Sequence, residues 1–367
     1  MEISLSELFD QEFMDGEYNG RADFAFEEHE TRRLCQRLQQ EVNSALRDQA
    51  GRIVGPPKIL YFDFIKSNRV NATSKAADGD VYLIGATQGM VSRTREAVLR
   101  LTADPEFYRL LRIDASPSDL TGQDGEQTVA QAFQDHVFEL TFLFATNHEL
   151  GHQVHGHTSL VGSNAGPETF AELERTQIRQ AMEIEADGYA AFASLNTIFS
   201  PEWLARIEAT VPSGQRVGIQ QMWLKLFFLA AAAYLDASPG RELNWENLAA
   251  TDYPPYFLRL EYFLAHIEGL CEIHQPHLVH VLGDPALIHC LLDLTSKAWE
   301  RTDGDTRITL AKELTGADED AYLKHIENLK RWRCIVRVVL APHRWEIRGL
   351  TTNEGDGASE QDSAVGN

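Results

Sequence analysis

Residues 148 to 152 read His-Glu-Leu-Gly-His, which places two histidines four positions apart. On a helix these positions share one face, so both imidazoles can bind the same zinc ion. Glu149 would lie beside the metal, where it can act as a base toward a zinc-bound water without binding the metal itself. The pattern predicts one zinc ion per chain, bound by His148 and His152 at about 2.0 to 2.2 Å.

A catalytic zinc ion needs a third protein ligand and an open position for water. Downstream, Glu183 and Asp187 stand four positions apart and share a helix face, whereas Glu185 points to the other side. In a pair of antiparallel helices, Glu183 returns beside the histidines as the third ligand. Asp187 can then accept a hydrogen bond from a ligand imidazole and fix its tautomer. The alternative is an acidic, solvated helix face.

A second alternative for the third ligand is local. A metzincin needs a glycine three residues after the second histidine and another histidine three residues later, but His155 and Thr158 occupy these positions. His155 and His157 therefore remain either alternative ligands or surface histidines at the negative end of the helix dipole.

The elements that must position these residues are mostly helical. Apolar residues dominate from Gln127 to about Val154, and a second long helix is expected over residues 167–200, joined to the first by the loop 156–166. Further helices are expected over residues 23–48, 89–102, 105–113, 201–209, 215–237, 256–273, 285–301 and 317–333.

The sequence before residue 90 predicts a small β-structure. Residues 58–65 and 81–85 are rich in β-branched and aromatic side chains, and residues 75–80 are typical of a turn. These two strands are expected to form a hairpin or small sheet. We further expect an acidic, loosely ordered N-terminus over residues 1–22, a single domain over 23–350 with a helical C-terminal extension, a loop over 114–126 and a disordered tail over 351–367.

The charge and composition exclude several classes of function. Asp and Glu number 55 against 33 Lys and Arg, which gives a net charge of −22. Such a chain repels phosphate backbones and anionic lipid, so neither nucleic-acid binding nor a role on an acidic membrane is expected. The most apolar stretch, Met222 to Leu235, is interrupted by Lys225 and is expected to be a core helix rather than a membrane span.

The cysteines and the N-terminal sequence favour a cytoplasmic protein. Cys35, Cys271, Cys290 and Cys334 are widely spaced and form no CxxC pair, which is typical of reduced structural thiols. The first residues are acidic and lack the basic and apolar regions of a secretory signal.

The order HExxH and then ExxxD resembles the gluzincin metallopeptidases, in particular the HtpX-type and CAAX prenyl endopeptidases. Residues 70–72, 81–84 and 89–91 are similar to the NAF, strand and GLL pattern of that family. Residues 253–260, YPPYFLRL, are similar to its HPPxxxRL segment. The resemblance covers residues 68 to 262. It implies a mainly α (α+β) zincin-like metallopeptidase fold, with a small N-terminal β-sheet, an HExxH active-site helix and a helical C-terminal half.

The resemblance also implies roles for residues outside the metal site. The strand around residues 81–84 would form the rim of the cleft and pair with an extended peptide. In the family's oxyanion segment, Tyr253 stands in the place of the histidine and would donate a hydrogen bond to the oxyanion, while Arg259 would supply charge or hold the Pro254–Pro255 turn. The expected substrate-binding residues are Asn71, Ala72, Val81, Tyr82 and Leu83.

The sequence departs from this family in three ways. The membrane helices of the HtpX and prenyl-protease branches are absent, Thr73 occupies the place of the NAF phenylalanine, and Tyr253 replaces the histidine of HPP. The soluble Lit-type phage-exclusion peptidases are another group of HExxH proteins of similar size.

The sequence thus predicts a soluble zinc endopeptidase that acts on a protein or peptide substrate, without nucleic-acid binding or membrane insertion. One alternative is an inactive peptidase-fold protein that serves as a binding or regulatory module. Another is a non-peptidase metal hydrolase or a chance motif. The substrate, the oligomeric state and any activating partner stay open.

Overall fold

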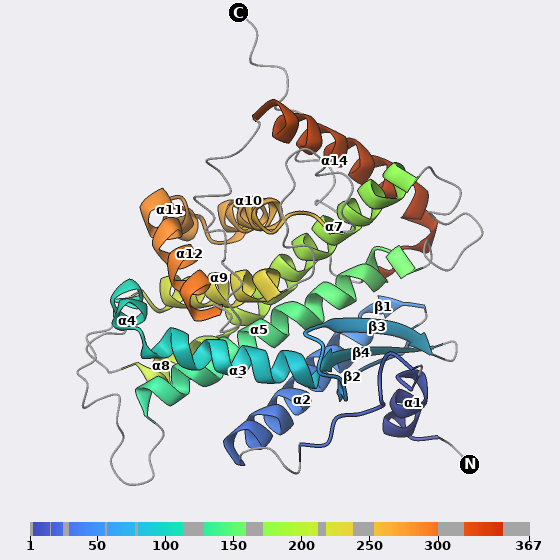
Figure 1. The fold of residues 1–367 in the computed structure, drawn as a ribbon, viewed down its shortest axis with the longest axis horizontal. Coiled ribbons are helices and arrows are strands. Elements are labelled where there is room, and N and C mark those ends of the chain that lie inside the picture. The colour runs from blue at the N-terminus through green and yellow to red at the C-terminus, as the bar shows by residue number, and fades with distance from the viewer. Residues whose placement is uncertain are drawn as a thin grey trace, which may run out of the picture.

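The computed structural model describes residues 3–14, 16–24, 29–55, 57–77, 80–112, 128–158, 172–211, 218–237, 253–299 and 319–347. The loop predicted over 114–126 and the tail predicted over 351–367 lie outside these ranges. Within them the chain is mainly helical, with a small mixed sheet at one side (Figure 1). This agrees with the mainly α class expected from the sequence.

Helix α5 (Val129–Val154) is the centre of the molecule. It begins at a capping box in which Thr128 and Gln131 satisfy each other's backbone N–H groups. Between Asp135 and Val154 every residue except His152 is buried. A helix that is surrounded in this way is a core element, and α5 packs against α7 (Glu172–Ile198), α9 (Ile219–Ala237) and α3 (Gln88–Ala103).

Most of the remaining helices agree with the expected segments. They are α2 (His29–Ala50), α4 (Pro105–Leu111), α8 (Pro201–Thr210), α10 (Tyr256–His274), α12 (Pro285–Trp299) and α14 (Glu319–Leu340). Helix α14 continues past the end expected near residue 333, because Val336 and Leu340 keep its apolar stripe packed on α7. The short helix α11 (Val279–Leu282) was not predicted.

The sheet has three strands in the order β2 (Ile59–Ile65), β4 (Val81–Thr87), β3 (Ala72–Ala77). The small sheet predicted before residue 90 is confirmed. A hairpin of β2 and β4, the other predicted arrangement, is wrong, because these two strands pair in parallel and the hairpin is formed by β3 and β4. Residues 75–77 of β3 were expected to belong to a turn, and no strand was predicted over residues 72–74. Their small and polar side chains are those of an edge strand, which has a weaker sequence signal than a buried one.

The N-terminal segment contains helix α1 (Leu5–Glu12) instead of being loosely ordered throughout. Ser4 and Glu7 form a capping box at its start. Phe9 and Phe13 are fully buried, and the Phe9 ring lies 6.0 Å from that of Tyr61 on β2. Burial of these two aromatic rings stabilises the segment, although its acidic composition predicted a loosely ordered chain.

The C-terminal part of the described chain returns to the N-terminal half. Helix α14 lies along α7 (Figure 1), and the strand β5 (Glu346–Ile347) that follows it pairs antiparallel with β1 (Ile53–Val54). Residues far apart in sequence therefore meet beside the sheet.

In the part of the chain that the structure describes, no single helix is long and apolar enough to cross a membrane. Pro276–Leu282 and Pro285–Thr295 reach the necessary length and hydropathy only together, with a bend of 62° between them. The apolar stretch of α9 is a buried core helix, as expected, and its Lys225 donates to the carbonyl oxygen of Leu110 at 2.7 Å. All four cysteines are free thiols.

Candidate metal centre

The site forms where α5 and α7 cross closely as antiparallel helices. Asn147 Nδ2 donates to Ser194 Oγ at 3.0 Å, and one helical turn later His152 lies beside Glu183. A Cβ atom at Gly151 would lie 3.0 Å from the Cα of Ala186, closer than nine in ten real contacts. The glycine within HELGH therefore allows the two backbones to approach each other.

The structure brings His148, His152 and Glu183 together as a group that could hold a metal ion. His148 Nε2 lies 3.1 Å from His152 Nε2 and 3.3 Å from Glu183 Oε2, and His152 Nε2 lies 3.4 Å from Glu183 Oε1. Ligand atoms at the corners of a tetrahedron with metal bonds of 2.0 to 2.1 Å are separated by about 3.3 to 3.4 Å. The spacing fits a tetrahedral ion with one position left for another ligand.

The charges around this group favour a cation. Burial alone would lower the pKa of His148, but hydrogen bonds to Asp187 and Glu183 raise it to about 9. The pKa of Glu183 is lowered well below its usual value, because both imidazoles outweigh the effect of its burial. The two carboxylates are thus placed to stabilise positive charge at the ring nitrogens.

Asp187 orients His148. Its Oδ1 lies 2.8 Å from His148 Nδ1, which places a proton on Nδ1 and makes Nε2, on the side of Glu183, the nitrogen that a metal ion would bind. Arg259 donates to both oxygens of Asp187, at 2.8 and 2.7 Å, and its guanidinium also lies 3.6 Å from Glu183. Although burial would raise the pKa of Asp187, Arg259 keeps it below its usual value.

His157 lies behind His152 and is not part of the three-residue group. Its Nδ1 is 2.9 Å from His152 Nδ1, and its Nε2 is 3.3 Å from Glu185 Oε2. Burial lowers the pKa of His157 to about 4, so the ring is neutral and its Nδ1 can accept a hydrogen bond from His152 Nδ1–H. His155 stacks on His157 with 5.6 Å between ring centroids. His155, His157 and Glu185 therefore lie behind His152, on the side away from the three-residue group.

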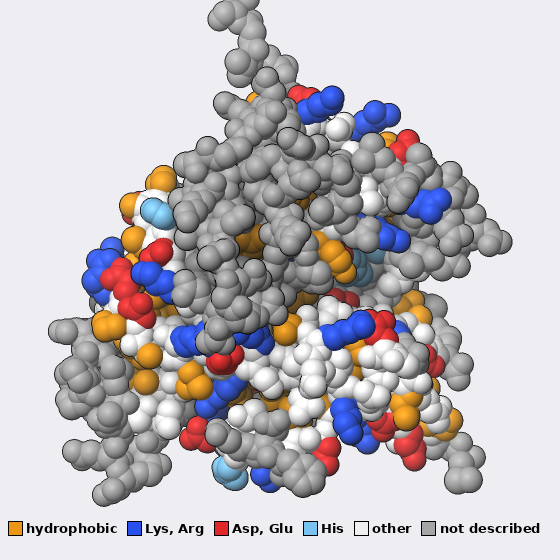
Figure 2. All heavy atoms as spheres, viewed as in Figure 1, with side chains coloured by type: hydrophobic (Ala, Val, Ile, Leu, Met, Phe, Trp, Pro, Cys, Tyr) orange, Lys and Arg blue, Asp and Glu red, His pale blue; other side chains and the backbone are white. Residues whose placement is uncertain are grey.

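Glu149 and strand β3 lie on the neighbouring face of α5. Glu149 is 8% exposed and does not belong to the metal group. Ser74 Oγ on β3 accepts from Gln153 Nε2 at 2.9 Å and contacts the backbone oxygen of Glu149 at 3.5 Å. β3 therefore runs beside the turn of α5 that carries the expected base. Figure 2 shows histidine and acidic side chains in a recess on the right of the view.

The predicted substrate strand is wrong. Val81, Tyr82 and Leu83 belong to β4, the central strand, which pairs with β2 on one side and β3 on the other. Its backbone groups are already used by the sheet, so they cannot bind a peptide. Asn71 and Ala72 lie at the start of β3, the edge strand, where the Asn71 amide nitrogen contacts the Tyr18 hydroxyl at 3.3 Å.

Two tyrosines are candidates for donating a hydrogen bond to a bound substrate. Tyr253 is partly exposed and precedes Pro255, the N-cap of α10; its role as the oxyanion donor stays a prediction. Tyr234 of α9 was not predicted, because it lies in an apolar run without any motif. It is buried, with its ring centroid 5.7 Å from that of His148, and burial together with Glu149 raises its pKa well above the usual value.

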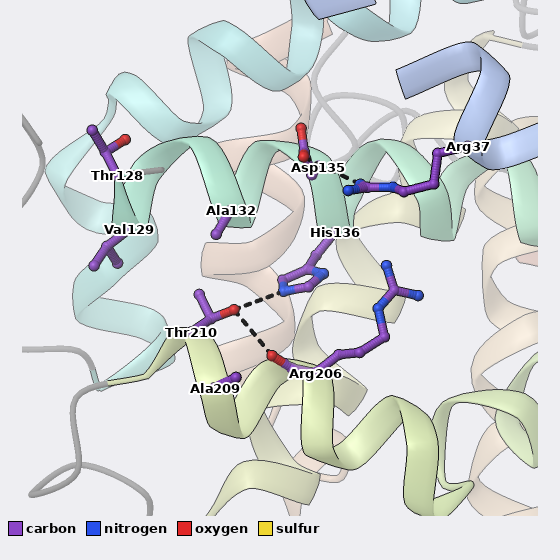
Figure 3. Close-up of a pocket in the computed structure, with 9 residues that line it drawn as sticks. All are labelled: Arg37, Thr128, Val129, Ala132, Asp135, His136, Arg206, Ala209 and Thr210. Carbon is purple, nitrogen blue, oxygen red and sulfur yellow. Dashed lines mark hydrogen bonds and ion pairs between the residues drawn. The ribbon is translucent and has the colours of Figure 1, made fainter. Parts of the chain in front are cut away.

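A separate polar pocket of about 380 Å³ lies near the start of α5, between α5 and α8 (Figure 3). Its arginines already bind carboxylates: Arg37 contacts Asp135 at 3.2 Å and also Glu139, and Arg206 contacts Glu139. The pocket is thus balanced in charge and lacks a group of metal ligands among the residues that line it.

Comparison with known proteins identifies no relative of this chain. No family profile matches it, and neither a curated protein nor a solved structure is significantly similar to it. Its function must therefore be inferred from its own residues.

Proposed function

We propose that the chain is a zinc-dependent endopeptidase of the gluzincin type with a zincin-like fold. The observation that carries this proposal is the spacing of His148, His152 and Glu183, with Glu149 adjacent on the same helix. Two imidazoles and one carboxylate form a common ligand set of catalytic zinc sites. The two neutral imidazoles and the carboxylate together carry a charge of −1, so a divalent ion bound to them keeps a net positive charge.

His148, His152 and Glu183 would hold the zinc ion, which would supply a Lewis acid toward water and a carbonyl oxygen. Glu149 accepts the proton of the attacking water and delivers it to the leaving amine. Asp187 and Arg259 keep His148 in the required tautomer through their hydrogen bonds, so they are positioning residues.

Within the described residues no strand pairs with the outer edge of β3, and this edge supports binding of an extended peptide. Thr87 N donates to Asn71 O at 2.9 Å, and hydrogen-bonded pairs alternate along an antiparallel ladder. The backbone groups of Ala72, Ser74 and Ala76 therefore point away from β4. A peptide that adds to this edge passes beside Glu149, which suits an enzyme that cleaves protein or peptide chains.

The proposal is tested with protein purified without added metal. We expect one zinc per chain and cleavage of an unfolded protein that phenanthroline blocks. Glu149→Gln should keep the zinc and lose cleavage, whereas Glu183→Ala should lose both. Glu202→Gln, at an exposed position of α8, is the matched control. Wild-type protein that binds no zinc would rule out the proposal, and full turnover in Glu149→Gln would remove Glu149 as the base.

A further inference from the structure

Helix α7 carries acidic residues at positions 183, 185 and 187, and they contact the proposed metal group and its surroundings from different sides. Glu183 is a ligand and Asp187 supports His148, while Glu185 faces away from the ligands. Glu185 is 3% exposed and still reaches the site, because His157 connects it to His152. An imidazole thus takes the place that a carboxylate holds behind His148.

Glu185 is held by two arginines from the C-terminal part of the chain. Arg337 Nε donates to Glu185 Oε1, and an Arg344 nitrogen lies 3.8 Å from Oε2. On its other side, Glu185 Oε2 accepts from His157 Nε2 at 3.3 Å. The carboxylate is therefore fixed from both sides.

Helix α14 is anchored so that Arg337 has a defined position. An apolar cluster joins it to α7, and Trp332 Nε1 donates to Gln177 Oε1 at 2.6 Å. The members of this cluster are Ile178, Ala181, Met182, Trp332, Val336 and Leu340.

The residues after α14 continue across the end of α5. Trp345 N donates to Val154 O at 3.0 Å, and the Trp345 ring packs at 4.8 Å from that of Tyr82 on β4. Gly156 has φ +75°, and a Cβ atom there would lie 2.8 Å from the oxygen of His343. Only glycine therefore allows the turn that presents His157 beneath this crossing segment.

The alternative is that these residues form a satisfied polar cluster that does not affect the metal site. The contacts favour an effect on the metal site, because the series from Arg337 through Glu185 and His157 ends on Nδ1 of the proposed ligand His152. Because a carboxylate can only accept, His157 Nε2–H donates to Glu185. A His152 that binds a metal ion through Nε2 carries its proton on Nδ1 and donates it to His157 Nδ1. This arrangement leaves His152 Nε2 free to face Glu183.

We propose that residues 319–347 position the metal centre from outside: Arg337 and Arg344 hold Glu185, Glu185 orients His157, and His157 orients His152. The inference rests on the proposed metal site at His148, His152 and Glu183. Because coupling between sites is reciprocal, a bound metal in turn stabilises the docked C-terminal segment.

The first measurement is metal affinity, by competition with a chelator for Zn²⁺ and Co²⁺. Loss of an outer partner of a ligand weakens binding by about 10 to 100-fold, so Arg337→Met and Glu185→Ala should fall in that range. Arg337→Lys keeps the charge and should restore most of the affinity. Arg331→Met, at an exposed position of the same helix, should behave as wild type. The visible absorption of bound Co²⁺ should change in Glu185→Ala, because the ring of His152 is no longer oriented.

The second measurement is hydrogen exchange over residues 319–347. Zn²⁺ should slow exchange there in the wild type and have less effect in Arg337→Met. The Arg337 side chain is 39% exposed, so this variant is expected to fold, and circular dichroism checks it. Wild-type affinity in folded Arg337→Met and Glu185→Ala would overturn the inference. If the wild-type chain binds no metal, both the proposed function and this inference are overturned. If the wild type binds metal without peptidase activity, and the variants bind it more weakly, only this inference is supported.

Discussion

Asp187 Oδ1 lies 2.8 Å from Nδ1 of His148, and both groups are buried. The carboxylate thereby links His148 on α5, a proposed metal ligand, to the guanidinium of Arg259 on α10. The orientation of the His148 imidazole is thus determined by three helices rather than by α5 alone.

The Asp187–His148 pair predicts the effect of Asp187→Asn. The amide keeps the size of the side chain but loses the charge that supports Nδ1–H, so zinc affinity should fall about 10 to 100-fold. Arg259 would lose its buried counter-charge, so the free energy of unfolding should also fall. Chelator competition and chemical denaturation measure the two effects. Asp293→Asn, in an exposed ion pair with Lys297, should change neither; equal zinc affinity in both variants would contradict the prediction.

The free edge of β3 predicts the effect of Ala76→Pro. Proline removes an N–H group that points away from β4, so one hydrogen bond to the substrate is lost while the sheet keeps its own. A hydrogen bond of about 1 kcal/mol corresponds to roughly a fivefold rise in KM with little change in kcat. Ala76→Ser keeps the N–H and is the matched control. Steady-state kinetics with a peptide substrate measure the KM of each variant. An equal KM in Ala76→Pro and Ala76→Ser would mean that the substrate does not pair with this edge.

Tyr253 and Tyr234 are distinguished by two phenylalanine variants. Loss of one oxyanion donor lowers turnover about 10²-fold, so Tyr253→Phe should have this effect with zinc retained. Tyr234→Phe is the comparison, because its phenol is buried beside His148. If turnover falls only in Tyr234→Phe, the donor is Tyr234 and the role predicted for Tyr253 is wrong.

His136, in the separate pocket of Figure 3, predicts how stability depends on pH. Burial, with help from Arg206 and Arg37, lowers the pKa of His136 to about 3. The unfolded chain binds a proton near pH 6.5, whereas the folded chain does not, so the free energy of unfolding falls as the pH drops below 6.5. From pH 7 to pH 5 this amounts to about 2 kcal/mol.

Denaturation curves at pH 7 and pH 5 test this prediction. His136→Gln should lose less stability than the wild type over this interval, because its side chain does not titrate. His280→Gln, at an exposed position, should show the full wild-type loss. An identical loss in His136→Gln and wild type would mean that His136 is protonated in the folded state.

Much of the helical fold could be predicted from local sequence. The start of α8 is marked by Ser200 and Pro201, and α5 shows a continuous apolar run. The antiparallel pairing of α5 and α7 was predicted from the HExxH pattern, because Glu183 can be the third ligand only if its helix returns beside the histidines. The structure brings His148, His152, Glu183 and Asp187 together, as this prediction requires.

The remaining features depend on contacts that local sequence does not contain. β3 was missed because residues 75–77 belong to a segment typical of a turn, and only pairing with β4 makes them part of a strand. The parallel pairing of β2 with β4 likewise depends on a strand that lies between them in the sequence. His157 and Glu185 are 28 residues apart, and no spacing rule indicates that they meet.

Between Asp135 and Val154, His152 is the only residue of α5 that is not buried. The side chains of His152 and Glu183 are 15% and 14% exposed, whereas that of His148 is 3% exposed. His152 and Glu183 therefore form the solvent-facing edge of this group, and His148 forms its inner wall. If the group holds an ion as proposed, the ion exchanges with solvent on the side of His152 and Glu183.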